Sequence, residues 1–324
     1  MPHEIDISAG KPAIAYVGEK PWHGLGEQLE PGASFETWLS AAGLKWRLER
    51  LPVQYLVSGG LKTMDDRFVL VRSDTHAALS VVSDDYQIVQ PSEVLEFYRD
   101  LVETCGYTLE TAGALDYGRK VWALARTGRT EAADVGGNDE LAAYVLLATS
   151  CDKTLATTAA FTSIRVVCQN TLFFALEDVG TNKRGHIKVA HNIYFNAQEV
   201  KEQLGIIDKA WPAFLEHVRK MAKHSMEPKK ASSFFQELFP QGKGKRLSSR
   251  AQREYETIIG LFQSAPGQEM SSAKGTLWGA VNAVSYYADH VRSGTAGERL
   301  NSAWFGSGSA LKERAWYQAL SMIS

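Results

Sequence analysis

The chain has 324 residues, a mass of 35.7 kDa and 44% hydrophobic residues, which support one large or two ordinary domains and exclude a globally disordered protein. Its 35 Lys and Arg residues against 37 Asp and Glu residues give a formal charge of -2. A nucleic-acid ligand would therefore need a local basic patch, because the protein as a whole carries no excess of positive charge.

The first part of the chain predicts a loop, a short helix and then strands. Residues 1–34 are rich in Gly and Pro, which predicts an ordered loop, and Ser34 is placed to be the N-cap of a helix that ends at residue 42. Beyond this helix the pattern changes to period two with β-branched residues, which is typical of strands. The strands that it predicts cover residues 52–58, 67–72, 77–82 and 86–89.

The next block combines strands with two longer helices. Apolar residues three and four positions apart predict a helix from Ser92 to Cys105. A hairpin of residues 107–111 and 120–126 follows, then a strand over 143–149 and a long, mostly apolar helix over 155–176. The expected fold class is α+β, with a twisted antiparallel sheet packed on helices that cover one face, followed by a mostly helical C-terminal part.

The composition changes after Gly180. Residues 180–189 predict a basic loop or a short β excursion, and beyond residue 196 nearly all of the pattern is helical. The predicted helices cover residues 196–225, 230–239, 248–262, 272–292 and 309–323. We predict an α+β domain over residues 1–195 and a helical domain over 196–324. Between Arg219 and Arg253, ten Lys and Arg residues against two Glu residues form a local basic zone.

A polar stripe on the predicted helix 155–176 is the first candidate site. On a helical projection Arg165 joins Thr158, Thr162 and Gln169 on one face, whereas Cys168 falls on the apolar face. Basic residues nearby could contact phosphates, and Tyr86, Tyr107, Tyr117, Trp122 and Tyr144 could stack bases. The predicted nucleic-acid-binding residues are Arg165, Lys153, Lys183, Arg184, Lys188, Arg119, Lys120, Thr158, Thr162 and Gln169.

Signatures of metal binding and of catalysis are missing from the sequence. His186 and His191 are five residues apart and His217 and His224 seven apart, unlike a helical zinc pair, and there is no Cys-x-x-Cys or Gly-x-Ser-x-Gly motif. We therefore expect a non-enzymatic protein with no metal and no cofactor. An unrecognised active site around Cys151, Asp152 and His23 is the remaining enzymatic alternative.

The sequence also indicates where the protein is found. Its three cysteines are odd in number and widely spaced, unlike a disulfide framework. No apolar run reaches the roughly 18 residues of a membrane-spanning helix, and residues 1–12 lack the pattern of a signal peptide. We expect a cytoplasmic protein without a membrane partner.

Four segments carry a resemblance to a known family. They are PWHGLG at 21–26, YQIVQP at 86–91, TSIRVVCQNTL at 162–172 and NSAWFG at 301–306. The chain resembles the phage/plasmid-like protein family that carries a domain of unknown function, DUF932. This resemblance implies an accessory role in the DNA metabolism of mobile elements and supplies no catalytic residues. The predicted order of strands and helices is also similar to that of phage single-strand annealing proteins, a likeness of fold alone.

These observations lead to two functional hypotheses. The first is a non-enzymatic protein that binds or anneals single-stranded DNA in phage or plasmid recombination or replication, and that assembles as a homo-oligomer through its C-terminal helices. The alternative is a protein-interaction module that modulates a host or element-encoded partner. Its anchors would be aromatic residues that could equally form the helical core, namely Trp278, Tyr286, Tyr287, Trp304, Phe305 and Trp316.

Overall fold

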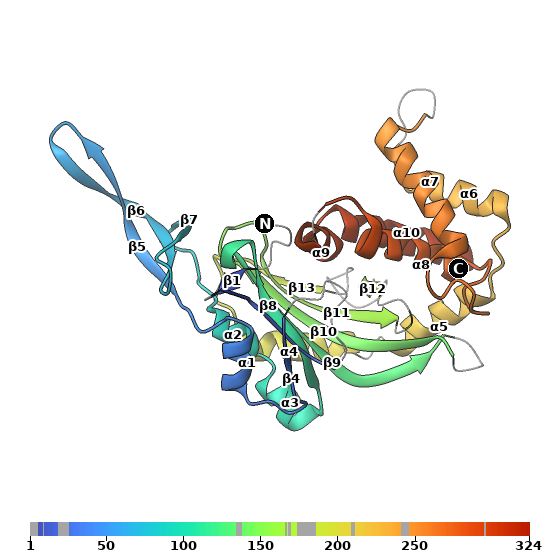
Figure 1. The fold of residues 1–324 in the computed structure, drawn as a ribbon, viewed down its shortest axis with the longest axis horizontal. Coiled ribbons are helices and arrows are strands. Elements are labelled where there is room, and N and C mark those ends of the chain that lie inside the picture. The colour runs from blue at the N-terminus through green and yellow to red at the C-terminus, as the bar shows by residue number, and fades with distance from the viewer. Residues whose placement is uncertain are drawn as a thin grey trace.

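A computed structural model describes most of the chain. The described residues are 6–8, 10–18, 26–133, 138–165, 167, 170–173, 186–208, 211–240, 246–294 and 296–324. Across these ranges the fold is α+β, as predicted, with most of the helices in the C-terminal part (Figure 1).

A twisted sheet forms the centre of the molecule. Within the described ranges it has eight strands in the order β12-β11-β10-β9-β8-β3-β4, and β13 also pairs with β11. All neighbours are antiparallel except β3 and β4. The strands are β3 (Ile14–Val17), β4 (Glu27–Leu29), β8 (Thr108–Leu115), β9 (Lys120–Ala132), β10 (Glu140–Ser150), β11 (Thr157–Arg165), β12 (Asn170–Phe173) and β13 (His186–Val189). The predicted hairpin around residues 113–118 is confirmed, with the single turn η1 (Asp116–Gly118) at its end.

The predicted helix over residues 155–176 is wrong. Residues 157–165 form β11, which pairs along its length with β10, and residues 170–173 form β12. Almost every residue of β11 is buried, so its apolar residues fit a helical spacing as well as they fit a strand buried on both faces. Its Thr and Phe residues favour the strand. The turn before it holds Lys153 at φ 66, a conformation that a helix does not use.

Helices cover both faces of the sheet, whereas the sequence predicts cover on one. The first face packs on α1 (Phe35–Ala41), α2 (Pro91–Glu96), α3 (Arg99–Cys105) and α4 (Ala197–Asp208) (Figure 1). Ser34 caps α1 as predicted, because its Oγ accepts the Thr37 N–H at 3.2 Å. The second face has its own apolar cluster, in which Trp122 of β9 meets Trp304 of α9 (Ala296–Phe305) at a ring distance of 5.1 Å.

Two local predictions on the first face differ from the structure. The helix predicted over 92–105 is interrupted at Phe97 and Tyr98, where the buried Tyr98 hydroxyl donates to the backbone oxygens of Ala123 (2.8 Å) and Val145 (3.1 Å). The strand predicted over 86–89 does not form. The backbone of this segment is bonded by other groups instead: the Arg50 guanidinium donates to the Tyr86 carbonyl oxygen, and the Gln87 N–H donates to the His191 carbonyl oxygen at 2.5 Å.

Three strands form a separate sheet that projects from one end of the molecule (Figure 1). They are β5 (Leu48–Val57), β6 (Gly60–Arg72) and β7 (Ala78–Ser83). The strands predicted here are confirmed, but β5 and β6 are longer than predicted. Their distal parts, residues 51–66, form a two-stranded ribbon that we call the arm. A separate antiparallel pair, β1 (Ile7–Ser8) and β2 (Lys11–Pro12), precedes β3 in the chain.

The C-terminal part is helical, as predicted, with three differences. The single helix predicted over 196–225 corresponds to two helices, α4 and α5. Helix α9 is missing from the prediction, and the long helix predicted over 272–292 consists of α8 followed by the π-helical turn η2. The remaining elements are α5 (Trp211–Lys223), α6 (Pro228–Glu237), α7 (Ser249–Ser264), α8 (Leu277–Tyr286), η2 (Tyr287–Val291) and α10 (Ser307–Ile323). One apolar cluster runs from the sheet into these helices, so the boundary at residues 195 and 196 stays a prediction.

A buried lysine joins the helices to the edge of the sheet. Lys312 of α10 donates from Nζ to Asp289 Oδ1 of η2 at 2.7 Å and to the Thr171 carbonyl oxygen of β12 at 2.9 Å. Asp289 in turn accepts the Thr171 N–H at 2.7 Å. Burial lowers the pKa of Lys312, and the opposing effect of Asp289 only partly offsets it. Lys312, Asp289 and the Thr171 backbone thus satisfy one another's hydrogen bonds, and these bonds hold the edge strand β12 against the helices.

The base of the arm is held by a second buried cation. Arg72 of β6 lies over the Trp46 ring at 4.3 Å, forms an ion pair with Asp6 at 2.5 Å and bonds the Asp74 carboxylate at 2.8 and 2.9 Å. The hydrogen bond from Arg72 lowers the pKa of Asp74, and burial opposes this shift.

The lowered pKa of Asp74 predicts a pH-dependent stability. The stabilisation is fully present above the ordinary pKa of 3.8 and is lost as the pH falls through the lower pKa of the folded state. Asp74→Asn should therefore lower the Tm at pH 7. The difference in Tm between the variant and the wild-type protein should become smaller below pH 3.8. Thermal unfolding followed by circular dichroism measures this. Asp85→Asn, at an exposed position, is the control. A Tm difference between Asp74→Asn and wild type that stays constant with pH would contradict the prediction.

Candidate anion-binding site

Arg165, the central residue of the predicted site, is not available to a ligand. It stands at the end of β11 with 1% of its side chain exposed, and Asp139, just before β10, is fully buried. The two side chains form a bidentate ion pair, with Nε to Oδ1 at 2.5 Å and Nη2 to Oδ2 at 2.9 Å. The hypothesis that Arg165 contacts phosphates is therefore wrong.

The same ion pair connects the sheet to the helical part. Asp139 Oδ2 also accepts Ser272 Oγ at 2.5 Å and Trp278 Nε1 at 3.1 Å, and Arg165 Nη2 donates to the Gly267 carbonyl oxygen at 2.9 Å. Gly267 has φ +80, and a Cβ there would meet Arg165 Nη1 at 2.8 Å, so this close approach needs glycine. The role of Arg165 is structural, since its hydrogen bonds hold the α7–α8 segment against β11.

Of the other predicted basic residues, Lys120 lies opposite Ser150 of β10 and Lys188 opposite Thr158 of β11, at the end of the sheet next to the turn that holds Lys153. Lys153 is exposed in the turn before β11, and Lys188 is exposed on β13. Arg119 is half-buried, bonded to Asp116 Oδ1 at 3.2 Å and to the Leu79 carbonyl oxygen at 3.3 Å, and Lys120 is also half-buried. Lys183, Arg184 and Gln169 lie outside the described residues.

The predicted polar and aromatic contacts are mostly internal. Thr158 and Thr162 are buried on β11, where their hydroxyls donate to the carbonyl oxygens of Ala156 (2.8 Å) and Ser163 (3.4 Å). Among the proposed stacking residues Tyr86, Trp122 and Tyr144 are buried, whereas Tyr117 is exposed. Trp278 and Trp316, proposed as interaction anchors, are core residues of the helical part. Tyr107, Tyr286, Trp304 and Phe305 are half-buried, so most members of both sets are at least partly covered by the protein itself.

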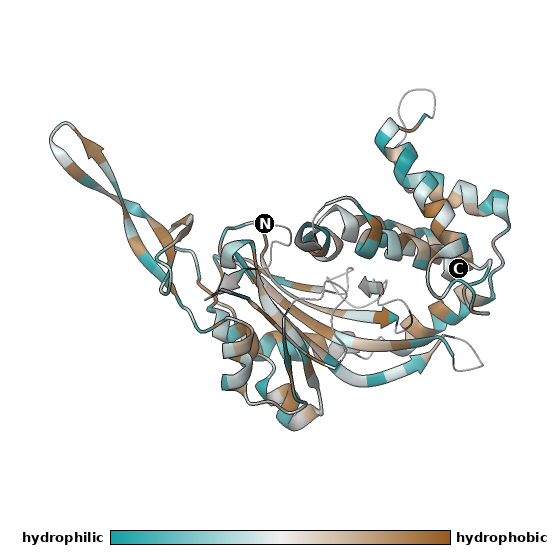
Figure 2. Ribbon diagram, viewed as in Figure 1, coloured by the Kyte–Doolittle hydropathy of each residue, from teal (hydrophilic) through white to brown (hydrophobic). Residues whose placement is uncertain are grey.

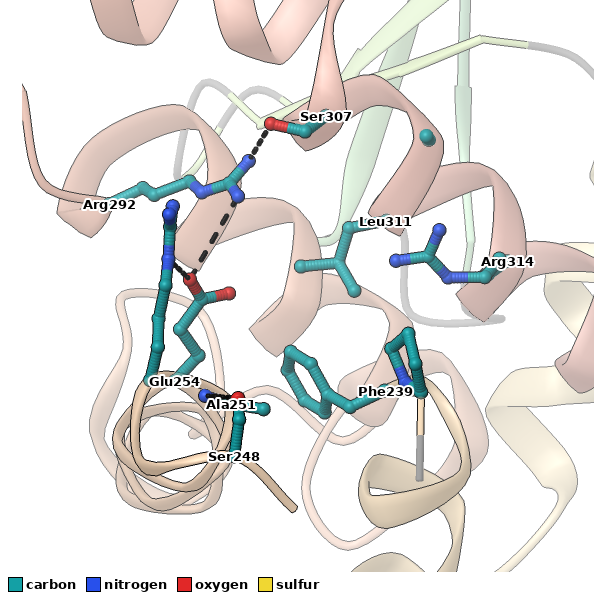
Figure 3. A pocket seen from close by; sticks show the side chains of 11 residues that line it. Phe239, Ser248, Ala251, Glu254, Arg292, Ser307, Leu311 and Arg314 are labelled. Atoms are coloured by element: carbon teal, nitrogen blue, oxygen red, sulfur yellow. Dashed lines mark hydrogen bonds and ion pairs between the residues drawn. The ribbon is translucent and has the colours of Figure 1, made fainter. Parts of the chain in front are cut away.

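A different set of arginines surrounds a pocket in the helical part (Figure 3). The pocket has a volume of about 220 Å³, and its described lining includes three arginines and a glutamate: Arg250 and Glu254 of α7, Arg292 after η2, and Arg314 of α10. Phe239, Pro240 and Leu311 supply an apolar wall on another side. Its charged lining therefore carries an excess of two positive charges.

Hydrogen bonds and ion pairs hold Arg292 and Arg250 at the pocket, and Arg314 donates from Nε to the Leu238 carbonyl oxygen at 3.1 Å. Arg292 donates from Nη1 to Ser307 Oγ at 2.8 Å and to Ser302 Oγ at 3.2 Å, and its Nη2 lies 3.9 Å from Glu254 Oε1 (Figure 3). Arg250 bonds the same carboxylate oxygen through Nε at 3.0 Å. Glu254 thus holds two guanidiniums side by side, and their remaining N–H groups are available to bind an anion.

The helix N-termini at the pocket carry partial positive charge, as the arginines carry full positive charge. Ser248 is the N-cap of α7, its Oγ accepting the Ala251 N–H at 3.2 Å, and Ser307 is the first residue of α10 after the Gly306 N-cap. Helix N-termini carry partial positive charge and favour anions. The neighbouring Tyr287 stays neutral, because burial, and then Glu254, raise its pKa to about 12. Guanidiniums and helix ends together suit a phosphate or carboxylate group.

Sequence reasoning points to only part of this pocket. Arg250 falls in the predicted basic zone, and the pattern at Ser248 predicts the start of a helix there. Arg292 and Arg314 lie 42 and 64 residues further along the chain, and no spacing in the sequence indicates that they meet Arg250. Packing of α10 against α8 and η2 brings them together.

The structure shows no activated thiol at the alternative enzymatic site. Cys151 is buried, and burial, with Asp152, raises the pKa of its thiol to about 12, so it is neutral at physiological pH. His23 lies outside the described residues. In the described part of the chain no cluster of three or more His, Cys, Asp or Glu side chains could hold a metal ion, and no helix is long and apolar enough to cross a membrane.

A family comparison places this structure in a class of proteins. Residues 78–312 match the family model described as Domain of unknown function (DUF932). The chain belongs to the DUF932 family, which agrees with the resemblance in its sequence. The match includes β7, the main sheet from β8 onward and the arginine pocket apart from Arg314, but not the arm. Comparison with curated proteins and with solved structures gave no match.

The buried ion pair makes a prediction about stability. Arg165→Met leaves the Asp139 carboxylate buried without its partner and should destabilise the protein by about 3–5 kcal/mol. Arg99→Met breaks an exposed pair with Glu96 and should cost about 1 kcal/mol or less. Urea unfolding of both variants measures this difference. Equal, small losses would contradict a structural role for Arg165.

Proposed function

We propose that the protein binds single-stranded nucleic acid through phosphates held at the arginine pocket, without catalysing a reaction on it. The observation that carries this proposal is that Arg250, Arg292 and Arg314 line one pocket beside the N-termini of α7 and α10. Fixed guanidiniums recognise phosphate oxygens by geometry as well as by charge.

The surface around the pocket favours a chain of phosphates over a single free anion. Exposed basic residues continue along the neighbouring segments, at Lys229 and Lys230 of α6 and at Arg246 before α7. A strand anchored by one phosphate in the pocket can therefore place further phosphates near these side chains. Such contacts release counterions and make binding depend steeply on salt.

The proposal includes a cellular role that rests on family resemblance. The DUF932 family match and the phage/plasmid-like motifs support an accessory function in the recombination or replication of a mobile element, in the cytoplasm and as a homo-oligomer. Binding to bases would be secondary, because most of the aromatic side chains first proposed to stack bases are buried. Affinity should accordingly vary little with base sequence.

A matched pair of variants tests the pocket. Arg250 and Arg253 are both exposed arginines on α7, but only Arg250 lines the pocket. Arg250→Gln should weaken binding of a fluorescein-labelled oligothymidylate several-fold and reduce the slope of log K against log salt by about 0.7–1. Fluorescence anisotropy titrations between about 50 and 200 mM salt measure both quantities.

Arg253→Gln is the control for a general effect of charge. It removes the same charge from the same helix outside the pocket, and affinity should stay within about twofold of wild type. Equal losses in the two variants would show that binding is diffuse, and no binding by the wild-type protein would reject the proposal.

A further inference from the structure

Basic side chains and one exposed aromatic ring lie together at one end of the central sheet. The hairpin turn η1 carries Tyr117, which is 59% exposed, and Lys120 begins β9 beside it. The turn between β10 and β11 carries the exposed Lys153, and Lys188 is exposed on β13. Apolar residues run through the strands of the sheet (Figure 2). We call Tyr117, Lys120, Lys153 and Lys188 together the lysine end.

Strand pairing places the three lysines across the same end of the sheet. Lys120 lies opposite Ser150, the last residue of β10, and Lys188 lies opposite Thr158, near the start of β11. Lys153 belongs to the turn that joins these two strands. Strands β9 and β13 are three strand spacings apart, which is roughly 14 Å. A chain of phosphates that crosses the end of the sheet would therefore meet the lysines one after another.

The backbone of the turn that carries Tyr117 is held in place. Asp116 and Tyr117 have φ values of 50 and 57, a left-handed conformation that is unfavourable for residues with a side chain. Arg72 Nη1 donates to the Tyr117 carbonyl oxygen at 3.0 Å, and the Cys151 N–H donates to the Arg119 carbonyl oxygen at 2.9 Å. The exposed ring therefore projects from a fixed base. An aromatic ring beside lysines is typical of a surface that stacks bases and contacts phosphates.

The lysine end carries an excess of positive charge. Its acidic neighbour is Asp152, whose Oδ1 accepts the Thr154 N–H at 3.0 Å and the Thr154 hydroxyl at 2.6 Å within the same turn. In the hairpin turn, Asp116 and Arg119 form an ion pair at 3.2 Å and cancel in charge. Three lysines against Asp152 leave an excess of two positive charges. This excess suits a chain of phosphates.

Helix α9 connects the lysine end to the arginine pocket. Trp122 is two residues after Lys120, so the two side chains share a face of the sheet, and the Trp122 ring meets Trp304 of α9 at 5.1 Å. Ser307, three residues beyond Trp304, lines the arginine pocket. Trp304 and Phe305 are half-buried between the two surfaces. A strand that leaves the pocket therefore has a short path over the end of α9 to the lysines.

We propose that the lysine end is a second contact surface for the strand held at the arginine pocket, with phosphates at the three lysines and a base stacked on Tyr117. This inference rests on the proposed function, because the pocket supplies the first anchor. Two anchors on one strand increase its affinity, because the second contact becomes intramolecular.

A triple variant tests the phosphate contacts. Lys120→Gln, Lys153→Gln and Lys188→Gln together should weaken binding of an oligothymidylate of about 20 residues about tenfold. The slope of log K against log salt should fall by about 2, because each phosphate contact on a single strand contributes about 0.7. Fluorescence anisotropy titrations between about 50 and 200 mM salt measure both quantities.

The matched control removes three exposed lysines outside both surfaces. Lys62→Gln, Lys220→Gln and Lys274→Gln together should leave the affinity within about twofold of wild type. If the wild-type protein binds the strand and the two triple variants have equal affinities, the lysine end is not a contact surface and the proposed function stands. No binding by the wild-type protein would reject the proposed function itself, and this inference with it.

The stacked base is tested separately from charge. Tyr117→Leu keeps the net charge and should weaken binding of the same oligothymidylate about fivefold, because it removes the ring on which a base stacks. Tyr55→Leu, at an exposed position on the arm, should leave the affinity unchanged. Equal affinities for Tyr117→Leu and Tyr55→Leu would overturn the assignment of a base to Tyr117.

Discussion

The ion pair between Arg165 and Asp139 is the contact on which the connection of sheet and helices depends. Both charges are buried, so neither can be removed without leaving the other unsolvated. Ser272 and Trp278 from the start of the helical layer complete the coordination of the carboxylate. The strand β11 and the α7–α8 segment are therefore positioned by one polar network, and the helices that form the arginine pocket are built on it.

Much of the fold could be predicted from the sequence, because its signals are local. The N-cap at Ser34, the alternation in β5 to β7 and the helical spacing beyond residue 196 each depend on neighbours a few residues away. The segment 157–165 was misassigned as a helix because β11 is buried on both faces and so lacks the polar alternation of an exposed strand. Its threonines were the available signal for a strand.

The site was harder to predict for a related reason. Arg165 has the charge of a ligand-binding residue, and only the position of Asp139 in space shows that its charge is already neutralised. Conversely, Arg250, Arg292 and Arg314 are distant in sequence, and packing of α7, η2 and α10 brings them to the lining of one pocket. A charge count finds the basic zone but does not show which guanidiniums are buried and which line a pocket.

Hydrogen–deuterium exchange with and without an oligothymidylate tests the central claim most directly. The first backbone N–H groups of a helix have no partner within the helix, so they exchange quickly until a ligand covers them. Ala251 and Gly308 already donate to Ser248 Oγ and Ser302 Oγ, and Ala310 to the Gly306 carbonyl oxygen. We therefore expect binding to slow exchange at residues 249 and 250 of α7 and 307 and 309 of α10, with no change along β11. Slowed exchange confined to β11, β13 and the turn at Lys153 would contradict the account and return the site to the sheet.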